Sequence, residues 1–92
     1  MIVSFSHKGL EAFYLTGSKK GIQSDHAGKL RRILDALNAA MAAQELNLPS
    51  FKLHPLKGNQ SGRWSIWVNG NWRVTFRFTG SDAELLDYLD YH

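Results

Sequence analysis

The 92-residue chain contains no cysteine, which excludes disulfide bonds and thiolate metal sites and is typical of a protein of the reducing cytoplasm. It also has no long hydrophobic run: the apolar stretch at residues 1–5 is followed by His7 and Lys8 and is too short for a signal sequence or a membrane span. No internal repeat and none of the usual spacings of metal ligands occurs. We therefore expect one cytoplasmic domain over residues 1–92, with no membrane contact, metal or other cofactor.

Acidic residues are absent from the segment 52–77, which carries five basic residues: Lys52, Lys57, Arg63, Arg73 and Arg77. From residue 81 onward the balance is reversed, with four acids and neither lysine nor arginine. A basic segment beside an acidic one indicates an anion-binding surface, for which a nucleic-acid backbone is a natural ligand. Charge alone favours the simpler alternative of a solvated face that pairs with a neighbouring strand.

Aromatic and β-branched residues dominate the segment 64–78, W-S-I-W-V-N-G-N-W-R-V-T-F-R-F, and predict a β-hairpin. We expect a three-residue loop, Asn69 to Asn71, because a two-residue loop would shift the register and mix the two faces. The predicted register pairs apolar residues across the strands: Val68 with Trp72, Ile66 with Val74 and Trp64 with Phe76. The opposite face then carries Ser65, Trp67, Arg73, Thr75 and Arg77. An exposed indole beside two arginines makes this face the expected functional surface.

The remaining chain predicts a strand at residues 2–5, a short helix at 8–15 and a final strand at 83–91. A second helix follows Ser24 or Asp25, either of which can cap it. Its apolar residues recur at helical spacing and are expected in the core: Ala27, Leu30, Ile33, Leu34, Leu37, Ala40 and Met41.

Basic side chains of the same helix, Lys29, Arg31 and Arg32, are expected to face outward. The element order β-α-α-β-β-β predicts an α+β fold. We expect a small mixed, mainly antiparallel sheet of about four strands, with the two N-terminal helices packed on one face.

RNA cleavage is a reaction that side chains of three separate stretches could carry out together: His54, Lys57, Arg73, Asp90, Tyr91 and His92. Attack of a 2′-hydroxyl on the adjacent phosphate needs a base, an acid and fixed positive charge, but no metal. Histidine serves either proton role near neutral pH, and arginine and lysine supply the charge. An aromatic ring can stack on a splayed base and align the attack.

Each of these groups also has a structural interpretation. A histidine before a proline, such as His54, is typical of a turn, and His92 lies at a chain end. Arg73 and Arg77 can pair with acids of the last strand, which stabilises by about 0–1 kcal/mol. Trp67 can pack against Arg73 in a cation–π contact. Spacing alone leaves both interpretations open.

Three motifs, L-H-P-L-K-G at 53–58, W-S-I-W-V-N-G-N-W-R-V-T-F at 64–76 and D-Y-x-D-Y-H at 87–92, resemble the HigB branch of the RelE/ParE toxin superfamily. The resemblance is in register from about residue 51 to residue 92, and the N-terminal half is similar in pattern only. It implies a RelE/ParE-like fold and the toxin of a type II toxin–antitoxin pair. The implied activity is ribosome-dependent mRNA endonuclease cleavage in the ribosomal A site, which inhibits translation.

Site residues follow from the same resemblance. His54 and His92 match positions of proton transfer, with base and acid left open, and Lys57 and Arg73 match positions that stabilise the phosphate. Tyr91 matches a position that orients the substrate, and Asp90 one that supports the site. Further contacts to RNA or the ribosome are expected from Lys52, Arg63, Trp67 and Arg77.

The implied partners are a HigA-type helix-turn-helix antitoxin, the 70S ribosome with its mRNA, and operator DNA through the antitoxin complex only. The sequence departs from the family pattern at Trp67, where a basic residue is common, and at Leu89, where an acid is common. The alternative is a non-catalytic toxin or binding module, either a gyrase poison like the ParE branch or a ribosome binder. The terminal segment 90–92 argues against the gyrase reading, because the ParE branch generally lacks the Tyr-His pair.

Overall fold

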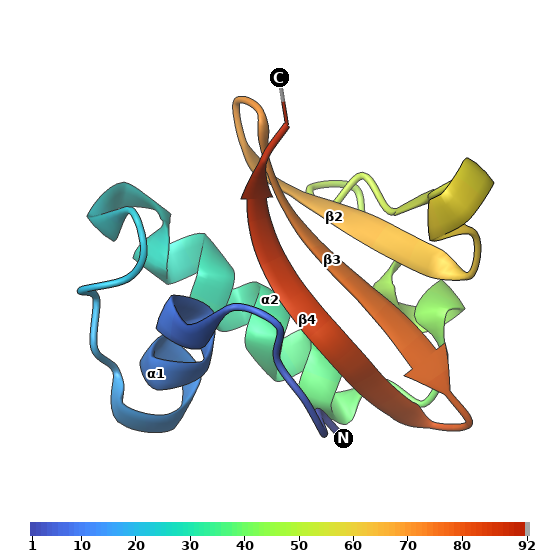
Figure 1. Cartoon of the computed structure of the whole chain (residues 1–92), viewed down its shortest axis with the longest axis horizontal. Helices are drawn as coiled ribbons and strands as arrows, with labels where there is room; N and C mark the ends of the chain where they lie inside the picture. The colour runs from blue at the N-terminus through green and yellow to red at the C-terminus, as the bar shows by residue number, and fades with distance from the viewer. Residues whose placement is uncertain (92) are drawn as a thin grey trace.

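A four-stranded antiparallel sheet with two α-helices on one side forms the chain, and the computed structural model describes residues 1–91 (Figure 1). The elements follow the order α1 (Lys8–Thr16), α2 (Ala27–Ala39), β1 (His54–Pro55), β2 (Arg63–Asn69), β3 (Trp72–Thr79) and β4 (Asp82–Asp90). The strands lie in the sheet in chain order, and short 3₁₀ turns occupy Ser24–His26, Ala43–Leu46 and Gly58–Gln60. The architecture confirms the α+β prediction. Neither α-helix of residues 1–91 has the length and apolar character that crossing a membrane requires.

The N-terminal segment runs beside β4 (Figure 1) and pairs with it in parallel at two isolated bridges, Ile2 with Ala83 and Phe5 with Leu86. The prediction of a continuous strand over residues 2–5 is therefore wrong, although the segment does lie against the sheet. Between the bridges the N–H of Leu85 donates to the side-chain oxygen of Ser4, because β4 bulges at this point and interrupts the ladder.

Helix α2 supplies most of the helical side of the core. Its residues Leu30, Ile33, Leu34 and Leu37 are fully buried, as the helical spacing predicted. They belong to one apolar cluster with the inward-facing side chains of the sheet: Ile66, Val68, Val74, Phe76, Ala83, Leu86 and Tyr88. Burying each large aliphatic side chain contributes about 1.5–3 kcal/mol, so this packing fixes the helical layer on the sheet.

Both ends of α2 differ from the prediction. Neither Ser24 nor Asp25 caps the helix: both lie in the preceding 3₁₀ turn, and the N-cap residue His26 makes no side-chain capping bond. The chain leaves the helix at Ala40, whose backbone is extended. Met41 therefore departs from the apolar stripe and is 63% exposed, so its predicted place in the core is wrong.

The β2–β3 hairpin reaches the predicted faces through a different turn. Trp64 pairs with Phe76 and Ile66 with Val74, as predicted. At the tip, however, Asn69 pairs with Trp72 across a two-residue turn, and Trp67 pairs with Arg73. The residue between, Val68, is an extra residue that forms a bulge and stays buried. The bulge compensates for the shorter turn, so the faces do not mix even though the predicted three-residue loop is wrong.

Candidate functional site

A pocket of about 400 Å³ lies on the outer face of the sheet, meaning the face of Ser65, Trp67, Arg73, Thr75 and Arg77, opposite the face that carries the apolar cluster. The residues that line the pocket come from both strands of the hairpin, from the segment before the hairpin and from the end of β4: Lys52, His54, Leu56, Ser65, Trp67, Arg73 and Tyr91. Segments far apart in the sequence thus converge here, which the predicted architecture allowed.

The segment before the hairpin is held along the edge of β2 by backbone hydrogen bonds. The N–H of Trp67 donates to the carbonyl of Phe51 at 2.7 Å, and the N–H of Leu56 donates to that of Arg63 at 2.9 Å. Between these bonds His54 pairs with Ser65 in the ladder. The buried Phe51 side chain anchors the segment, while the His54 imidazole stays exposed at the pocket. This geometry gives the imidazole a fixed backbone and free access to a ligand.

Arg73 is positioned by the hairpin turn. Its Nη1 donates to the carbonyl oxygens of Gly70 and Trp72, both at 3.0 Å. The indole Nε1 of Trp67 donates to the same Gly70 carbonyl at 2.9 Å. No carboxylate within residues 1–91 pairs with Arg73. The guanidinium is therefore oriented by neutral acceptors, and its charge remains available to an anion in the pocket.

The end of β4 is joined to the same turn. The N–H of Tyr91 donates to the carbonyl of Asn71 at 2.8 Å, and Asp90 lies opposite Trp72 in the ladder. The Tyr91 side chain is 37% exposed and lines the pocket. His92, the other histidine of the predicted set, lies outside the described residues.

Other predicted site residues do not line this pocket. Lys57 is exposed just before the 3₁₀ turn Gly58–Gln60, and Asp90 is exposed at the end of β4. Arg63 and Arg77 lie opposite each other where β2 begins, away from the hairpin turn that positions Arg73. The structure therefore brings together Lys52, His54, Trp67, Arg73 and Tyr91 from the predicted set.

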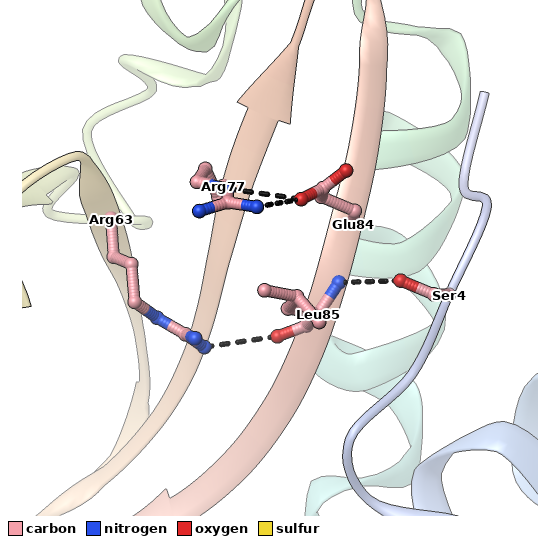
Figure 2. Close-up of polar contacts among 5 residues, drawn as sticks. All are labelled: Ser4, Arg63, Arg77, Glu84 and Leu85. Carbon is pink, nitrogen blue, oxygen red and sulfur yellow. Dashed lines mark hydrogen bonds and ion pairs between the residues drawn. The ribbon is translucent and has the colours of Figure 1, made fainter.

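Figure 2 shows how Arg63 and Arg77 are engaged. Arg77 forms an ion pair with Glu84 of β4, and its hydrogen bonds hold the pKa of Glu84 below the ordinary value. This is the cross-strand pair that the structural interpretation anticipated. Arg63 points instead toward the bulge in β4, where its Nη2 donates to the carbonyl of Leu85 at 2.9 Å. The same Nη2 donates to the hydroxyl of Thr75 in β3 at 3.1 Å.

The bulge explains what Arg63 does for the fold. Leu85 has a φ of 57°, a strained conformation for a branched side chain. Its N–H and carbonyl take no part in the β3–β4 ladder. They form hydrogen bonds instead with Ser4 and Arg63, which lie on either side (Figure 2). Arg63 thus satisfies an acceptor that would otherwise lack a partner.

Lys29 is a neighbour of the site that the sequence did not reveal. It was expected to face outward from α2, but its Nζ lies 4.2 Å from the centroid of the Trp67 ring. The Nζ of Lys52 lies 4.3 Å from the same ring. Trp67 therefore makes cation–π contacts with two lysines instead of the predicted contact with Arg73. Burial, together with the charges of Arg32 and Lys52, lowers the pKa of Lys29.

The pocket combines three chemical capabilities. An imidazole can accept or donate a proton, a guanidinium can stabilise a developing phosphate charge, and a phenol ring can orient a bound base. Within residues 1–91, no group of three or more histidines and carboxylates is arranged to hold a metal ion.

Comparison with known proteins decides the family. Residues 3–92 match the family described as the RelE-like toxin of the type II toxin–antitoxin system HigB. The chain belongs to the HigB-like toxin family. Membership implies an antitoxin partner. It also confirms the resemblance that the three sequence motifs indicated.

Relatives of known name support this HigB-like toxin assignment over the whole chain. It is 45% identical to the endoribonuclease HigB of Proteus vulgaris over 92 residues, which cover all of both chains. It is 36% identical over 94 residues to the toxin HigB-1 of Vibrio cholerae, covering all of this chain and 98% of the relative.

Solved structures agree in fold. The YoeB/ParE toxin from Agrobacterium tumefaciens matches with a TM-score of 0.67 at 17% identity, covering both chains completely. A point mutant of YafQ from E. coli matches with a TM-score of 0.63 at 20% identity, covering 96% of this chain and 89% of YafQ. These likenesses confirm the RelE/ParE-like fold.

Proposed function

We propose that this HigB-like toxin is an endoribonuclease that cuts mRNA on the ribosome and thereby inhibits translation. The observation that carries the proposal is the convergence of His54, Arg73 and Tyr91 from three separate segments on one pocket. A base or acid, a fixed cation and an aromatic ring are the parts that phosphodiester cleavage by a 2′-hydroxyl needs. The 45% sequence identity to an endoribonuclease HigB over the full length of both chains supports the same activity.

In the proposed reaction, one histidine takes the proton from the 2′-hydroxyl as its oxygen attacks the adjacent phosphorus. The bond from phosphorus to the 5′-oxygen then breaks, and a second group returns a proton to that oxygen. His54 and His92 are the two proton carriers, in an order that the reaction itself must decide. Arg73 stabilises the negative charge on the phosphorane-like transition state, and Tyr91 orients the nucleotide through its ring and a hydrogen bond from its hydroxyl. No metal takes part in these steps.

Two further residues act from outside the pocket lining in this proposal. Lys57 is exposed on the segment that follows His54 and supplies a second cation to the phosphate. Asp90 precedes Tyr91 and His92 and supports the terminal segment. Lys52 and Trp67, which line the pocket, also contact the RNA. Arg63 and Arg77 contribute less to RNA binding than the sequence suggested, because their guanidinium groups are already engaged within the sheet.

The partners follow from the role of a toxin that acts on translation. The ribosome presents the mRNA codon in its A site, and the pocket on the outer face receives it. A HigA-type helix-turn-helix antitoxin neutralises the toxin, and operator DNA is bound through that complex alone. These events take place in the cytoplasm, where the ribosomes are.

Primer extension on a defined mRNA tests the proposal. The mRNA is incubated with the purified protein, with and without translating ribosomes. We expect cuts in phase with the reading frame that appear only with ribosomes. Cuts on naked RNA would instead identify a ribosome-independent ribonuclease. The absence of cuts in both reactions, from protein shown to be folded, would favour the non-catalytic alternative.

A further inference from the structure

Three side chains from separate elements meet at one side of the pocket: Lys29 of α2, Lys52 before β1 and Trp67 of β2. The two ammonium groups lie 4.2 and 4.3 Å from the centroid of the same indole ring. We call this group the lysine–tryptophan cluster. Because Lys52 and Trp67 also line the pocket, the cluster adjoins the space that a substrate would occupy.

Within the described residues, the positive charge of the cluster has no carboxylate partner. The ion pairs within residues 1–91 join the N-terminus to Asp82 and Arg77 to Glu84, so neither lysine is paired with a carboxylate there. Burial lowers the pKa of Lys29, and the charges of Arg32 and the adjacent Lys52 lower it further. The indole offsets part of this repulsion, but it carries no negative charge. Two adjacent cations without a carboxylate are suited to an anionic ligand.

Contacts other than ion pairs hold the two lysines in place. The Nζ of Lys29 donates to the carbonyl of Ser50 at 2.6 Å. Lys52 has a φ of 47°, which a residue with a side chain rarely adopts. Its neighbour Phe51 keeps this conformation, because the Phe51 side chain is buried and its carbonyl accepts the N–H of Trp67. Local strain maintained by surrounding structure is typical of residues that bind a ligand.

We infer that Lys29 and Lys52, held over Trp67, bind a phosphodiester of the RNA strand next to the linkage that is cut. The inference rests on the proposed function, which places the cleaved phosphate at Arg73 in the same pocket. Successive phosphates of one strand would then meet Arg73 and the lysine–tryptophan cluster. In this arrangement Trp67 supports two cations, so the indole does not serve as a stacking platform for a base. Lys29 becomes a substrate-binding residue contributed by the helical layer.

Lys29→Met tests the inference, with Lys20→Met as the matched control because Lys20 is exposed in the loop after α1. Ribosome-dependent cleavage is measured against toxin concentration at several potassium concentrations. We expect Lys29→Met to raise the half-saturating concentration about tenfold and leave the maximal rate nearly unchanged. The slope of log affinity against log salt should become shallower by about 0.7, as expected for one lost phosphate contact on a single strand.

The salt slope separates binding from a structural role. Lys29→Met also loses the hydrogen bond to Ser50 and can lower thermal stability, but lower stability alone would not change the slope. Lys29→Arg retains the charge and should restore most of the affinity. Lys52→Met should reproduce the effect if Lys29→Met fails to fold. Equal behaviour of Lys29→Met and Lys20→Met would overturn the inference.

A second experiment does not depend on cleavage. A 2′-O-methyl RNA trinucleotide, which lacks the nucleophilic hydroxyl, is titrated into the protein while the NMR signal of the Trp67 indole N–H is followed. Trp67→Phe assigns that signal. We expect the signal to shift, with binding about tenfold weaker in Lys29→Met. A shift in a wild-type protein that cleaves nothing would support the cluster and refute the proposed function, whereas no shift would refute the cluster.

Two other ligands give different results. If Lys29→Met weakens binding to ribosomes without mRNA as much as it weakens cleavage, the phosphate belongs to ribosomal RNA, and the assignment to the substrate strand is overturned. If it weakens antitoxin binding and leaves trinucleotide binding unchanged, the cluster binds an acidic protein segment, and the inference is likewise overturned.

Discussion

Tyr88 and Tyr91 lie three residues apart near the end of β4, and their side chains are on opposite sides of the sheet. Tyr88 belongs to the core and is 4% exposed, whereas Tyr91 lines the pocket. Replacing each with phenylalanine removes one hydroxyl and preserves the ring. We therefore predict opposite outcomes for the same chemical change: Tyr88→Phe lowers stability, and Tyr91→Phe lowers activity.

The stability effect follows from the contacts of the Tyr88 hydroxyl. It lies 2.6 Å from Nδ1 of the buried His26 and accepts the backbone N–H of Gln23 at 3.3 Å. Its ring stacks on Trp72 with a centroid distance of 4.5 Å, a contact that phenylalanine retains. Leaving the buried imidazole nitrogen unpaired costs about 1–3 kcal/mol. A domain of this size loses about 4–8 °C in Tm for each 1 kcal/mol.

The same tyrosine gives the prediction a pH dependence. Burial raises the pKa of Tyr88 above its ordinary value of 10.0, although the hydrogen bond from Gln23 opposes the rise. The raised pKa means that the stabilisation is complete below the pKa of the unfolded chain and is lost as pH rises through the folded pKa. The difference in unfolding free energy between wild type and Tyr88→Phe should therefore be constant near neutral pH and shrink in alkaline solution.

Tyr91→Phe serves as the matched variant. Within residues 1–91 the Tyr91 hydroxyl makes no hydrogen bond, so its removal should change stability by less than about 0.5 kcal/mol. In the proposed reaction the Tyr91 hydroxyl hydrogen-bonds the nucleotide, and the loss of this contact should slow mRNA cleavage about 10- to 100-fold. Chemical denaturation and primer extension measure the two effects. Comparable destabilisation by both substitutions, or slower cleavage by a fully folded Tyr88→Phe, would refute the assignment of the two tyrosines to opposite roles.

Two further pairs of variants separate packing from chemistry. Arg73→Ala should reduce cleavage about 100- to 1,000-fold while changing the free energy of unfolding by less than about 1 kcal/mol. Ile66→Ala, in the fully buried core, should lower the free energy of unfolding by about 2–5 kcal/mol. Similar denaturation midpoints for the two variants would contradict the placement of Arg73 outside the core. Gly9→Ala should destabilise by about 1–3 kcal/mol, because a Cβ there would lie 2.6 Å from the Gly21 carbonyl oxygen. Gly28→Ala in α2 should stabilise the protein by about 0.5–1 kcal/mol, because a Cβ at this position meets nothing within 4 Å. If the melting temperatures of Gly9→Ala and Gly28→Ala changed in the same direction, the Gly9–Gly21 contact would be contradicted.

Periodicity was sufficient to predict the layers of the fold. The helical spacing of Leu30, Ile33, Leu34 and Leu37 and the alternation in the hairpin each identify the side that must be buried, and the structure buries those sides. Such patterns constrain faces and not local geometry. The hairpin therefore kept its predicted faces through a shorter turn and a bulge at Val68, two changes that compensate for each other.

The structure departs from the predicted pattern where the tertiary fold determines the position of a side chain. Met41 matched the helical spacing but lies beyond the point at which the chain becomes extended. Lys29 was assigned to the solvent face because a charge on a helix usually faces water, yet a tertiary contact brings it to Trp67. Arg63 belongs to the basic segment but serves the strained bulge at Leu85, which no sequence pattern predicted.

The candidate site was predictable in part. The motifs identified His54, Arg73 and Tyr91 on separate segments, and in the structure all three line one pocket. Leu56 and Ser65 also line the pocket, but aliphatic and hydroxyl side chains in a strand carry no signal of function by themselves. Only their place relative to His54 makes them part of the site.

The central claim is that the pocket cleaves RNA by means of the RNA's own 2′-hydroxyl on the ribosome. The most direct test uses ribosomes programmed with an mRNA that has a single 2′-deoxynucleotide on the 5′ side of the linkage that is cut in the all-ribose message. We predict that the modified linkage stays intact while the all-ribose message is cut at that position. Cleavage of the modified linkage at an undiminished rate would contradict the account, because it would require a nucleophile other than the 2′-hydroxyl.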